Sequence, residues 1–247
     1  MDNNIPYDTI ICGDAVEVMS RLEDESIDLI FTDPPYGINF NNRGLAHHHE
    51  LVFGGNLKRM QARPIQGDGP EAILLFEAVV KEAARVLTRG GCFCCCCPGG
   101  GPKPIFAEWT LLMDKYLRFK QAVVWDKGGM GMGIHYRRNY EFVLVANRPG
   151  KITWNGGKTT PNVFRLPRII PSARQHPTEK PVGLAEHFIR LHSNPGEVVL
   201  DPFAGHGSTA VAAKRLGRRY IGVEIVPEYC EVARERVANT TPPLFVE

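Results

Sequence analysis

The chain has 247 residues, of which 43% are hydrophobic and 23% are charged, values typical of a globular protein with one buried core. Its 29 Lys and Arg against 27 Asp and Glu give a formal net charge of +2, so the total charge selects no class of partner. No stretch approaches the ~18 apolar residues of a membrane span, and residues 1–10 contain no basic region followed by an apolar core. We therefore expect a cytoplasmic protein without a membrane partner.

The first third of the chain alternates apolar runs with amphipathic stretches. Residues 7–14 and 26–33 are predicted to be short buried strands, connected by a helix over 15–22. Residues 41–69 are rich in Gly, Asn, His and Arg, which favours a long mobile loop. Residues 70–87 carry apolar side chains at helical spacing, which predicts an amphipathic helix.

The second predicted strand ends in the unusual sequence Asp33-Pro34-Pro35-Tyr36. Proline has no N–H to donate to a sheet, so the strand must stop at this point. A carboxylate directly after a buried strand is costly unless its charge is used. The sequence therefore predicts a rigid loop with a functional role at the end of this strand.

Five of the seven cysteines lie in the run CFCCCC at residues 92–97. The run follows Gly90 and Gly91, which we expect to end the preceding helix, so it is predicted to be a buried strand. Side chains alternate between the two faces of a strand, so four adjacent thiols cannot surround one metal ion. We expect these cysteines to act as small buried hydrophobic residues in a reducing compartment, and we expect no metal site here or at the adjacent histidines 47–49.

The remaining chain continues the alternation. Helices are predicted near 105–118 and 182–192, and strands at 121–126 and 140–150. Residues 196–238 are predicted to form a strand, a glycine loop, a helix, a strand and a helix. Strands that alternate with helices predict a single α/β domain over the whole chain, with a mostly parallel sheet covered on both faces.

The glycine loop in this last segment is a candidate ligand site. Gly205 and Gly207 follow a buried strand and open a helix, so the backbone can turn tightly and a ligand can approach it closely. The spacing is neither G-x-G-x-x-G nor that of a phosphate-binding loop. Glu224 ends the next strand about 20 residues on, where it can accept hydrogen bonds from ribose hydroxyls. Together these features favour an adenosine-containing cofactor beyond the ends of the two strands.

Positive charge is concentrated between Arg137 and Gln175. This segment holds eight Lys and Arg and one acid, Glu141, which gives 8 − 1 = +7. Trp154 and Phe164 are interleaved with the charges. The mixture suits a nucleic acid, with cations for phosphates and planar groups for bases, although a solvated basic face has the same composition. Part of the segment, residues 150–175, shows no periodicity and is expected to be irregular.

Four motifs follow one another along the chain: DPPY at 33–36, HPTEKP at 176–181, DPFAGHGST at 201–209 and GVEI at 222–225. Together they resemble the amino-methylating DNA methyltransferases, which transfer a methyl group from S-adenosylmethionine to an exocyclic nitrogen of a base. The order of the motifs is similar to that of the circularly permuted β group, which includes bacterial and phage adenine methylases. The resemblance covers residues 7–238 and implies a Rossmann-like, doubly wound, seven-stranded sheet with one antiparallel strand.

The resemblance also assigns the chemistry of the DPPY loop. The amine of a base is a poor nucleophile, because its lone pair is delocalised into the ring. In this family the carboxylate of Asp33 and the carbonyl of Pro34 would accept hydrogen bonds from both N–H groups and so free the lone pair. Pro34 and Pro35 would hold that carbonyl still. Tyr36 would stack on the base after it is flipped out of the duplex, with the methyl donor placed in line.

The cofactor contacts implied by the resemblance come from several motifs. Asp201 would receive the amino group of the methionine part, Glu224 the ribose hydroxyls and Asp14 the adenine amine. The position of Asp14 also suits a simple helix cap. Thr178 and Lys180 are expected at the carboxylate of the cofactor. The residues expected to line the methionine part are Phe203, Ala204, Gly205 and Gly207.

We expect no separate DNA-binding domain after the last predicted helix, so recognition of DNA is expected from within this domain or from a partner. The expected sources are the segment 127–175, the loop 41–69 or a second subunit in a homodimer. The sequence leaves open whether such an enzyme acts alone or beside a separate restriction endonuclease. The candidate DNA contacts are His135, Tyr136, Arg137, Arg138, Arg165 and Arg168.

Adenine in double-stranded DNA is the favoured target, because Asp at the first position of the tetrad more often accompanies adenine in this family and Ser accompanies cytosine. The alternatives are the amine of cytosine, an RNA methyltransferase with the same cofactor, a nicotinamide-dependent oxidoreductase and a non-catalytic DNA-binding module. The spacing of FAGHG disfavours the oxidoreductase, and the intact Asp33 disfavours the non-catalytic module.

Overall fold

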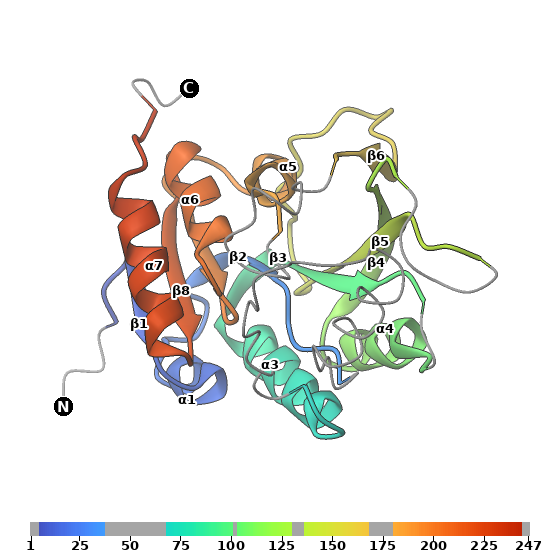
Figure 1. Ribbon diagram of the computed structural model, residues 1–247, viewed down its shortest axis with the longest axis horizontal. Coiled ribbons are helices and arrows are strands. Elements are labelled where there is room, and N and C mark those ends of the chain that lie inside the picture. Colours follow the sequence, from blue (N-terminus) through green and yellow to red (C-terminus); the bar gives the residue numbers. More distant parts are fainter. Residues whose placement is uncertain (1–4, 38–67, 101–102, 130–135, 168–179, 244–247) are drawn as a thin grey trace, which may run out of the picture.

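The computed structural model describes residues 5–37, 68–100, 103–129, 136–167 and 180–243. These residues form a central sheet with helices on both of its sides (Figure 1). The strands are β1 (Thr9–Cys12), β2 (Ile27–Thr32), β3 (Leu87–Pro98), β4 (Arg118–Asp126), β5 (Tyr140–Asn147), β6 (Val163–Arg165), β7 (Val198–Asp201) and β8 (Arg219–Glu224). The helices are α1 (Ala15–Ser20), α3 (Ala72–Val86), α4 (Ile105–Tyr116), α5 (Val182–His192), α6 (Ser208–Arg215) and α7 (Pro227–Ala238).

The eight strands of the described residues form one sheet in the order β1-β8-β7-β2-β3-β5-β4-β6. β5 runs antiparallel to both of its neighbours, β3 and β4, and the other pairs are parallel. The expected doubly wound, mostly parallel sheet with one antiparallel strand is confirmed. The sheet has one strand more than the seven expected, because Val163–Arg165, in a segment expected to be irregular, pair with the outer edge of β4.

β7 and β2 are neighbours in the middle of the sheet, although they come from opposite ends of the chain. Leu29 lies opposite Val199, and Ile30 lies opposite Leu200. From β7 the chain continues to β8 on one side, and from β2 it continues to β3 on the other side. The direction of winding therefore reverses between β7 and β2, and open α/β sheets bind ligands outside the carboxyl ends of the strands at such a point.

Each face of the sheet has its own hydrophobic core. The face covered by α1, α3 and α4 buries Phe76, Phe93 and Trp109. The face covered by α5, α6 and α7 buries Phe188 and Val211. Because both faces are covered, β2 and β3 are apolar and buried over Leu29–Phe31 and Cys92–Cys97, and they show no polar alternation there.

The cysteine run lies in β3 and is buried, as its sequence predicts. Its side chains alternate between the two cores. Cys95 and Cys97 belong to the core under α1, α3 and α4, whereas Cys92, Cys94 and Cys96 belong to the core under α5, α6 and α7.

Other expectations about single segments have mixed outcomes. The helix expected over 70–87 is confirmed as α3, but Gly90 and Gly91 do not end it, because they lie within β3 where its register with β2 shifts. The loop expected at 41–69 lies outside the described residues, apart from 68 and 69. Within the described part of the chain, every helix is too short or too polar to cross a membrane.

Candidate active site

The carboxyl ends of β2, β7 and β8 bring the predicted catalytic and cofactor residues to one edge of the sheet. Asp33 follows β2, Gly205 lies in the loop after β7, and Glu224 is the last residue of β8. The hydroxyl of Thr32 donates a hydrogen bond of 2.7 Å to Asp201 Oδ1, so the ends of β2 and β7 are in direct contact. The DPPY loop and the glycine loop therefore start side by side.

Asp33 is held by two side chains. The hydroxyl of Tyr36 donates to Asp33 Oδ1 at 2.5 Å, and Lys180 Nζ donates to Asp33 Oδ2 at 2.6 Å. A carboxylate oxygen can accept two hydrogen bonds, so each oxygen of Asp33 keeps the capacity for one further donor. The side chain of Asp33 is 26% exposed, so it remains within reach of a substrate.

A second carboxylate, Glu141 at the start of β5, adjoins this group and was not identified as a site residue from the sequence. Glu141 Oε2 lies 3.5 Å from Lys180 Nζ, and Glu141 Oε1 accepts a hydrogen bond from Lys127. Asp33, Lys180, Glu141 and Lys127 thus form a connected ion-pair network with no net charge. Glu141 is the only acid between residues 137 and 175, and that isolated charge is the signal that could have identified it.

The groups in this network shift the pKa values of their neighbours. Burial lowers the pKa of Lys180, but Asp33 and Glu141 raise it by more, so it lies above the ordinary lysine value. Burial raises the pKa of Glu141, but Lys180 and Lys127 outweigh burial and hold the pKa below its usual value. Burial and the charge of Asp33 raise the pKa of Tyr36 well above its usual value. At neutral pH Lys180 is therefore charged, Glu141 is ionised, and Tyr36 keeps the proton that it donates to Asp33.

The end of the DPPY loop is fixed by packing and hydrogen bonds. The ring of Tyr36 packs edge-on against Trp109, with ring centroids 5.7 Å apart. The N–H of Gly37 donates to the buried Asp68 at 2.6 Å, and its carbonyl accepts from Lys103 Nζ at 2.8 Å. Gly37 has φ +69°, and a Cβ there would lie 2.9 Å from a backbone oxygen, so this position requires glycine. These contacts agree with the predicted rigidity of the loop.

Asp201 has all of its described contacts inside the protein. Its Oδ1 accepts hydrogen bonds from the Thr32 hydroxyl and the Phe203 N–H, and its Oδ2 accepts one of 2.6 Å from the Thr209 hydroxyl. Burial raises the pKa of Asp201 to about 6, although these hydrogen bonds act in the opposite direction. Asp201 therefore ties β2, the glycine loop and α6 together, and its contact with the cofactor amine stays a prediction.

The glycine loop contains one open and one packed glycine. Gly205 has φ +50°, and no described atom lies within 4 Å of a Cβ built on it, so its backbone is open to a ligand. Gly207 has φ +77°, and its Cβ would lie 3.0 Å from that of Ala233, so glycine is needed for packing against α7. The N–H of Gly205 donates to Glu224 Oε2 at 2.9 Å, which fixes the loop relative to the acid. Open backbone beside a strand-end carboxylate fits an adenosine-containing cofactor.

The structure gives less direct support for the predicted cofactor contacts of Asp14 and Thr178. Asp14 caps α1, because its Oδ1 accepts a hydrogen bond of 2.9 Å from the N–H of Glu17. The N–H of Gly13 donates to the Glu224 carbonyl at 3.0 Å, so Asp14 still adjoins the end of β8. Thr178 lies outside the described residues. The cofactor contacts of Asp14 and Thr178 stay predictions.

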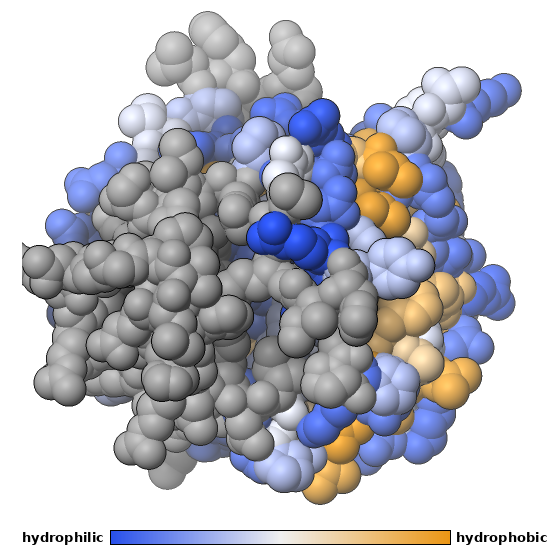
Figure 2. Space-filling model, turned by 45° about the vertical axis from the view of Figure 1, so that its right-hand side comes forward, coloured by the Kyte–Doolittle hydropathy of each residue, from blue (hydrophilic) through white to orange (hydrophobic). Residues whose placement is uncertain are grey.

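Exposed basic and aromatic residues border the same edge of the sheet. Arg165 ends β6, and residues 136–138 precede β5, whose first residues lie at this edge because β5 is antiparallel. Tyr136 is 96% exposed, and the coloured part of the face in Figure 2 combines hydrophilic residues with hydrophobic patches. The DNA contacts expected at His135 and Arg168 lie outside the described residues. The exposed candidates in the described part are Tyr136, Arg137, Arg138 and Arg165.

A glycine loop open to a ligand, a strand-end acid and an accessible carboxylate thus meet where the winding of the sheet reverses. This combination is typical of α/β enzymes that bind an adenosine-containing cofactor. Residues 27–235 match the profile of a protein family described as DNA methylase, with members that act on N6 or N4 amines. The chain belongs to this family of S-adenosylmethionine-dependent DNA amino-methyltransferases.

Individual relatives agree with this family. DNA adenine methyltransferase YhdJ of Escherichia coli (strain K12) is 31% identical over 265 residues, which cover 93% of this chain and 82% of YhdJ. The solved structure of TTHA0409 from Thermus thermophilus, complexed with S-adenosyl-L-methionine, is 26% identical with a TM-score of 0.68 and covers 96% of this chain and 97% of that one. The PvuII DNA methyltransferase, described as cytosine-N4-specific, shares the fold with a TM-score of 0.68 at 19% identity, over 92% of this chain and 85% of that one.

Proposed function

We propose that this enzyme methylates the exocyclic amine of adenine in double-stranded DNA at a specific sequence. The observation that carries the proposal is the carboxylate of Asp33, oriented by Tyr36 and Lys180 next to the glycine loop. An acid at this position favours adenine, and the relative YhdJ is described as a DNA adenine methyltransferase. Cytosine is the second candidate, because the PvuII enzyme with the same fold is described as cytosine-N4-specific.

Asp33 would activate the amine by accepting one of its N–H groups. The free acceptor capacity on each Asp33 oxygen allows this without breaking the bonds from Tyr36 and Lys180. The carbonyl of Pro34 would accept the second N–H, so that the nitrogen lone pair leaves conjugation with the ring. S-adenosylmethionine supplies an electrophilic methyl group on its sulfonium. Asp33 is then the group placed to take the proton that the methylated nitrogen loses.

Lys180 would act on the reaction through Asp33. The contact with the cofactor carboxylate stays a separate prediction for the same residue. Its ammonium group fixes one carboxylate oxygen, and Glu141 compensates the remaining charge. Because the network has no net charge, its partial burial costs less than that of an isolated carboxylate. Asp33 is thereby presented to the substrate in one orientation, which is what proximity and orientation require.

DNA would be bound along the carboxyl edge of the sheet by the segment 127–175. Arg137, Arg138 and Arg165 are exposed there, and Tyr136 presents an almost fully exposed ring. Arginines at such a surface bind phosphates or the guanine edge in the major groove. The flipped adenine would enter between this surface and Tyr36. An enzyme that acts on cellular DNA would work in the cytoplasm.

The test is a methylation assay with labelled S-adenosylmethionine and either duplex DNA or RNA, followed by mass spectrometry of the nucleosides. We expect N6-methyladenine in duplex DNA only. Methylcytosine without methyladenine would overturn the proposed base, and methylated RNA without methylated DNA would overturn the proposed substrate. Sequencing of modified bases in a host that expresses the chain gives the recognition site in the same experiment.

A further inference from the structure

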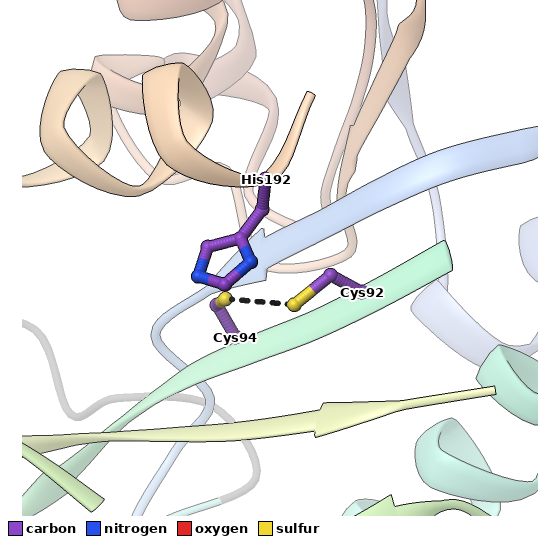
Figure 3. A group of neighbouring side chains, drawn as sticks. All are labelled: Cys92, Cys94 and His192. Carbon is purple, nitrogen blue, oxygen red and sulfur yellow. Dashed lines mark hydrogen bonds between the residues drawn. The ribbon is translucent and has the colours of Figure 1, made fainter. Parts of the chain in front are cut away.

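Cys92, Cys94 and His192 form a cluster that contains no residue of the DPPY loop. Cys92 and Cys94 are two residues apart on β3 and therefore point to the same face, and His192 is the last residue of α5, which packs over that face (Figure 3). The two Sγ atoms are 3.4 Å apart. One ligand atom from each of the three residues lies within 4.8 Å of the others.

The fold holds the members of this cluster in place. β3 is a central strand, paired with β2 on one side and β5 on the other, so the two thiols have fixed positions. The ring of His192 packs near two aromatic side chains, with its centroid 6.4 Å from that of Phe188 and 5.3 Å from that of Trp154. A preformed group of this kind needs little rearrangement to bind an ion.

The donor atoms of these three residues favour zinc. Two cysteine thiolates and one imidazole are ligands that zinc takes in proteins, with a fourth position left for water. With Zn–S bonds of ~2.3 Å in tetrahedral geometry the two sulfurs would lie about 3.8 Å apart, so small side-chain rotations from the observed separation suffice. Two thiolates and Zn²⁺ also give a cluster of zero net charge, which an apolar core buries at lower cost than a charged one.

We propose that Cys92, Cys94 and His192 bind one Zn²⁺ ion that links the end of α5 to β3. This proposal departs from the expectation of no metal site. Four adjacent thiols on a strand cannot bind one ion. Cys92 and Cys94, however, are every second residue and share one face of β3, and His192 of α5 supplies the third ligand. The ion would anchor the end of α5 to β3, and its site lies at the opposite end of that helix from Lys180.

Cobalt and zinc titrations of the full chain test the site directly. The protein is first freed of metal with a chelator under a phosphine reductant, and Co²⁺ is then added. We expect one equivalent to bind with the near-ultraviolet charge-transfer absorption of thiolate–cobalt bonds, and Zn²⁺ to displace it. A folded wild-type chain that binds no stoichiometric Co²⁺ or Zn²⁺, or that binds Co²⁺ without this absorption, would overturn the proposal whatever the variants do.

Single substitutions then assign the ligands. Cys92→Ser, Cys94→Ser and His192→Asn should each weaken zinc binding at least tenfold in competition with a chromogenic chelator. The matched control is Cys95→Ser, a buried thiol on the same strand that faces the other core. Equal weakening by Cys95→Ser, or full affinity in the three ligand variants, would refute the assignment. Circular dichroism of each metal-free variant tests whether that variant is folded, so that affinities are compared only between folded chains.

Discussion

Replacing Lys180 with Met removes one positive charge from the ion-pair network and keeps a side chain of similar bulk. Lys180 Nζ lies 2.6 Å from Asp33 and 3.5 Å from Glu141, and its side chain is only 16% exposed. Removing one partner from a buried ion pair costs about 3–5 kcal/mol, because the remaining charge is left uncompensated. Lys127 still compensates Glu141, so we expect the lower end, a loss of about 3 kcal/mol in the free energy of unfolding.

The loss of stability in the Lys180→Met variant should depend on pH in a defined direction. The folded-state pKa of Glu141 lies below its usual value, so ionised Glu141 contributes stability above an unfolded-state pKa of ~4.3, and this contribution disappears as the pH falls through the folded pKa. In Lys180→Met only Lys127 opposes burial, so the pKa of Glu141 rises and the carboxyl group takes up a proton more easily. The difference in stability between the two proteins should therefore be largest at neutral pH and shrink as the pH falls toward the unfolded-state pKa of ~4.3.

Urea unfolding at several pH values between about 4 and 8 measures this difference. The control is Lys115→Met, because Lys115 pairs with Glu77 at the surface and its loss should change stability much less. Turnover should fall more than cofactor affinity if Lys180 acts through Asp33. A loss that is equal at all pH values, or no larger than that of the control, would refute the assigned role of the network.

Three further substitutions test separate parts of the site. Asp33→Ala should lower kcat at least about a hundredfold while calorimetry shows nearly unchanged cofactor affinity, and normal turnover would disprove the role of Asp33. Thr32→Val removes a donor to the buried Asp201 and should cost ~1–3 kcal/mol in chemical denaturation; an unchanged midpoint would show that this bond does not stabilise the meeting of β2 and β7. Arg165→Ala should weaken duplex binding across sequences and reduce the slope of log affinity against log salt by ~1, and unchanged binding would exclude Arg165 from the interface.

The fold and the position of the site could be predicted because strong local signals mark the ends of strands. Pro34 and Pro35 cannot continue a strand, and the open glycine at 205 needs a backbone conformation that other residues avoid. β6 has no comparable signal: it has three residues at the sheet edge, and the side chains of Val163 and Arg165 are exposed. Its strand conformation depends on pairing with β4, which the local sequence does not encode.

The ion-pair network could not be predicted, because it depends on contacts between distant segments. Lys180 and Asp33 are 147 residues apart, and the motif containing Lys180 suggested only a cofactor contact. Glu141 reaches the site because β5 runs antiparallel and so begins at the edge where the parallel strands end. The grouping of His192 with two cysteines likewise requires the packing of α5 on β3, which no local pattern gives.

Because of the order of the elements along the chain, the active site forms only when β7 pairs with β2 in the middle of the sheet. Asp33 follows a strand near the start of the chain, whereas Lys180 and the glycine loop come from its last third. They meet only when β7 inserts beside β2, where the Thr32–Asp201 hydrogen bond joins the two strand ends. Lys180 directly precedes the N-cap of α5. Because α5 packs against both α6 and β2, the helix that positions this lysine is also held in place when β7 pairs with β2. A chain in which β7 failed to pair with β2 would therefore lose the glycine loop and the orientation of Asp33 together, which couples formation of the catalytic geometry to completion of the fold.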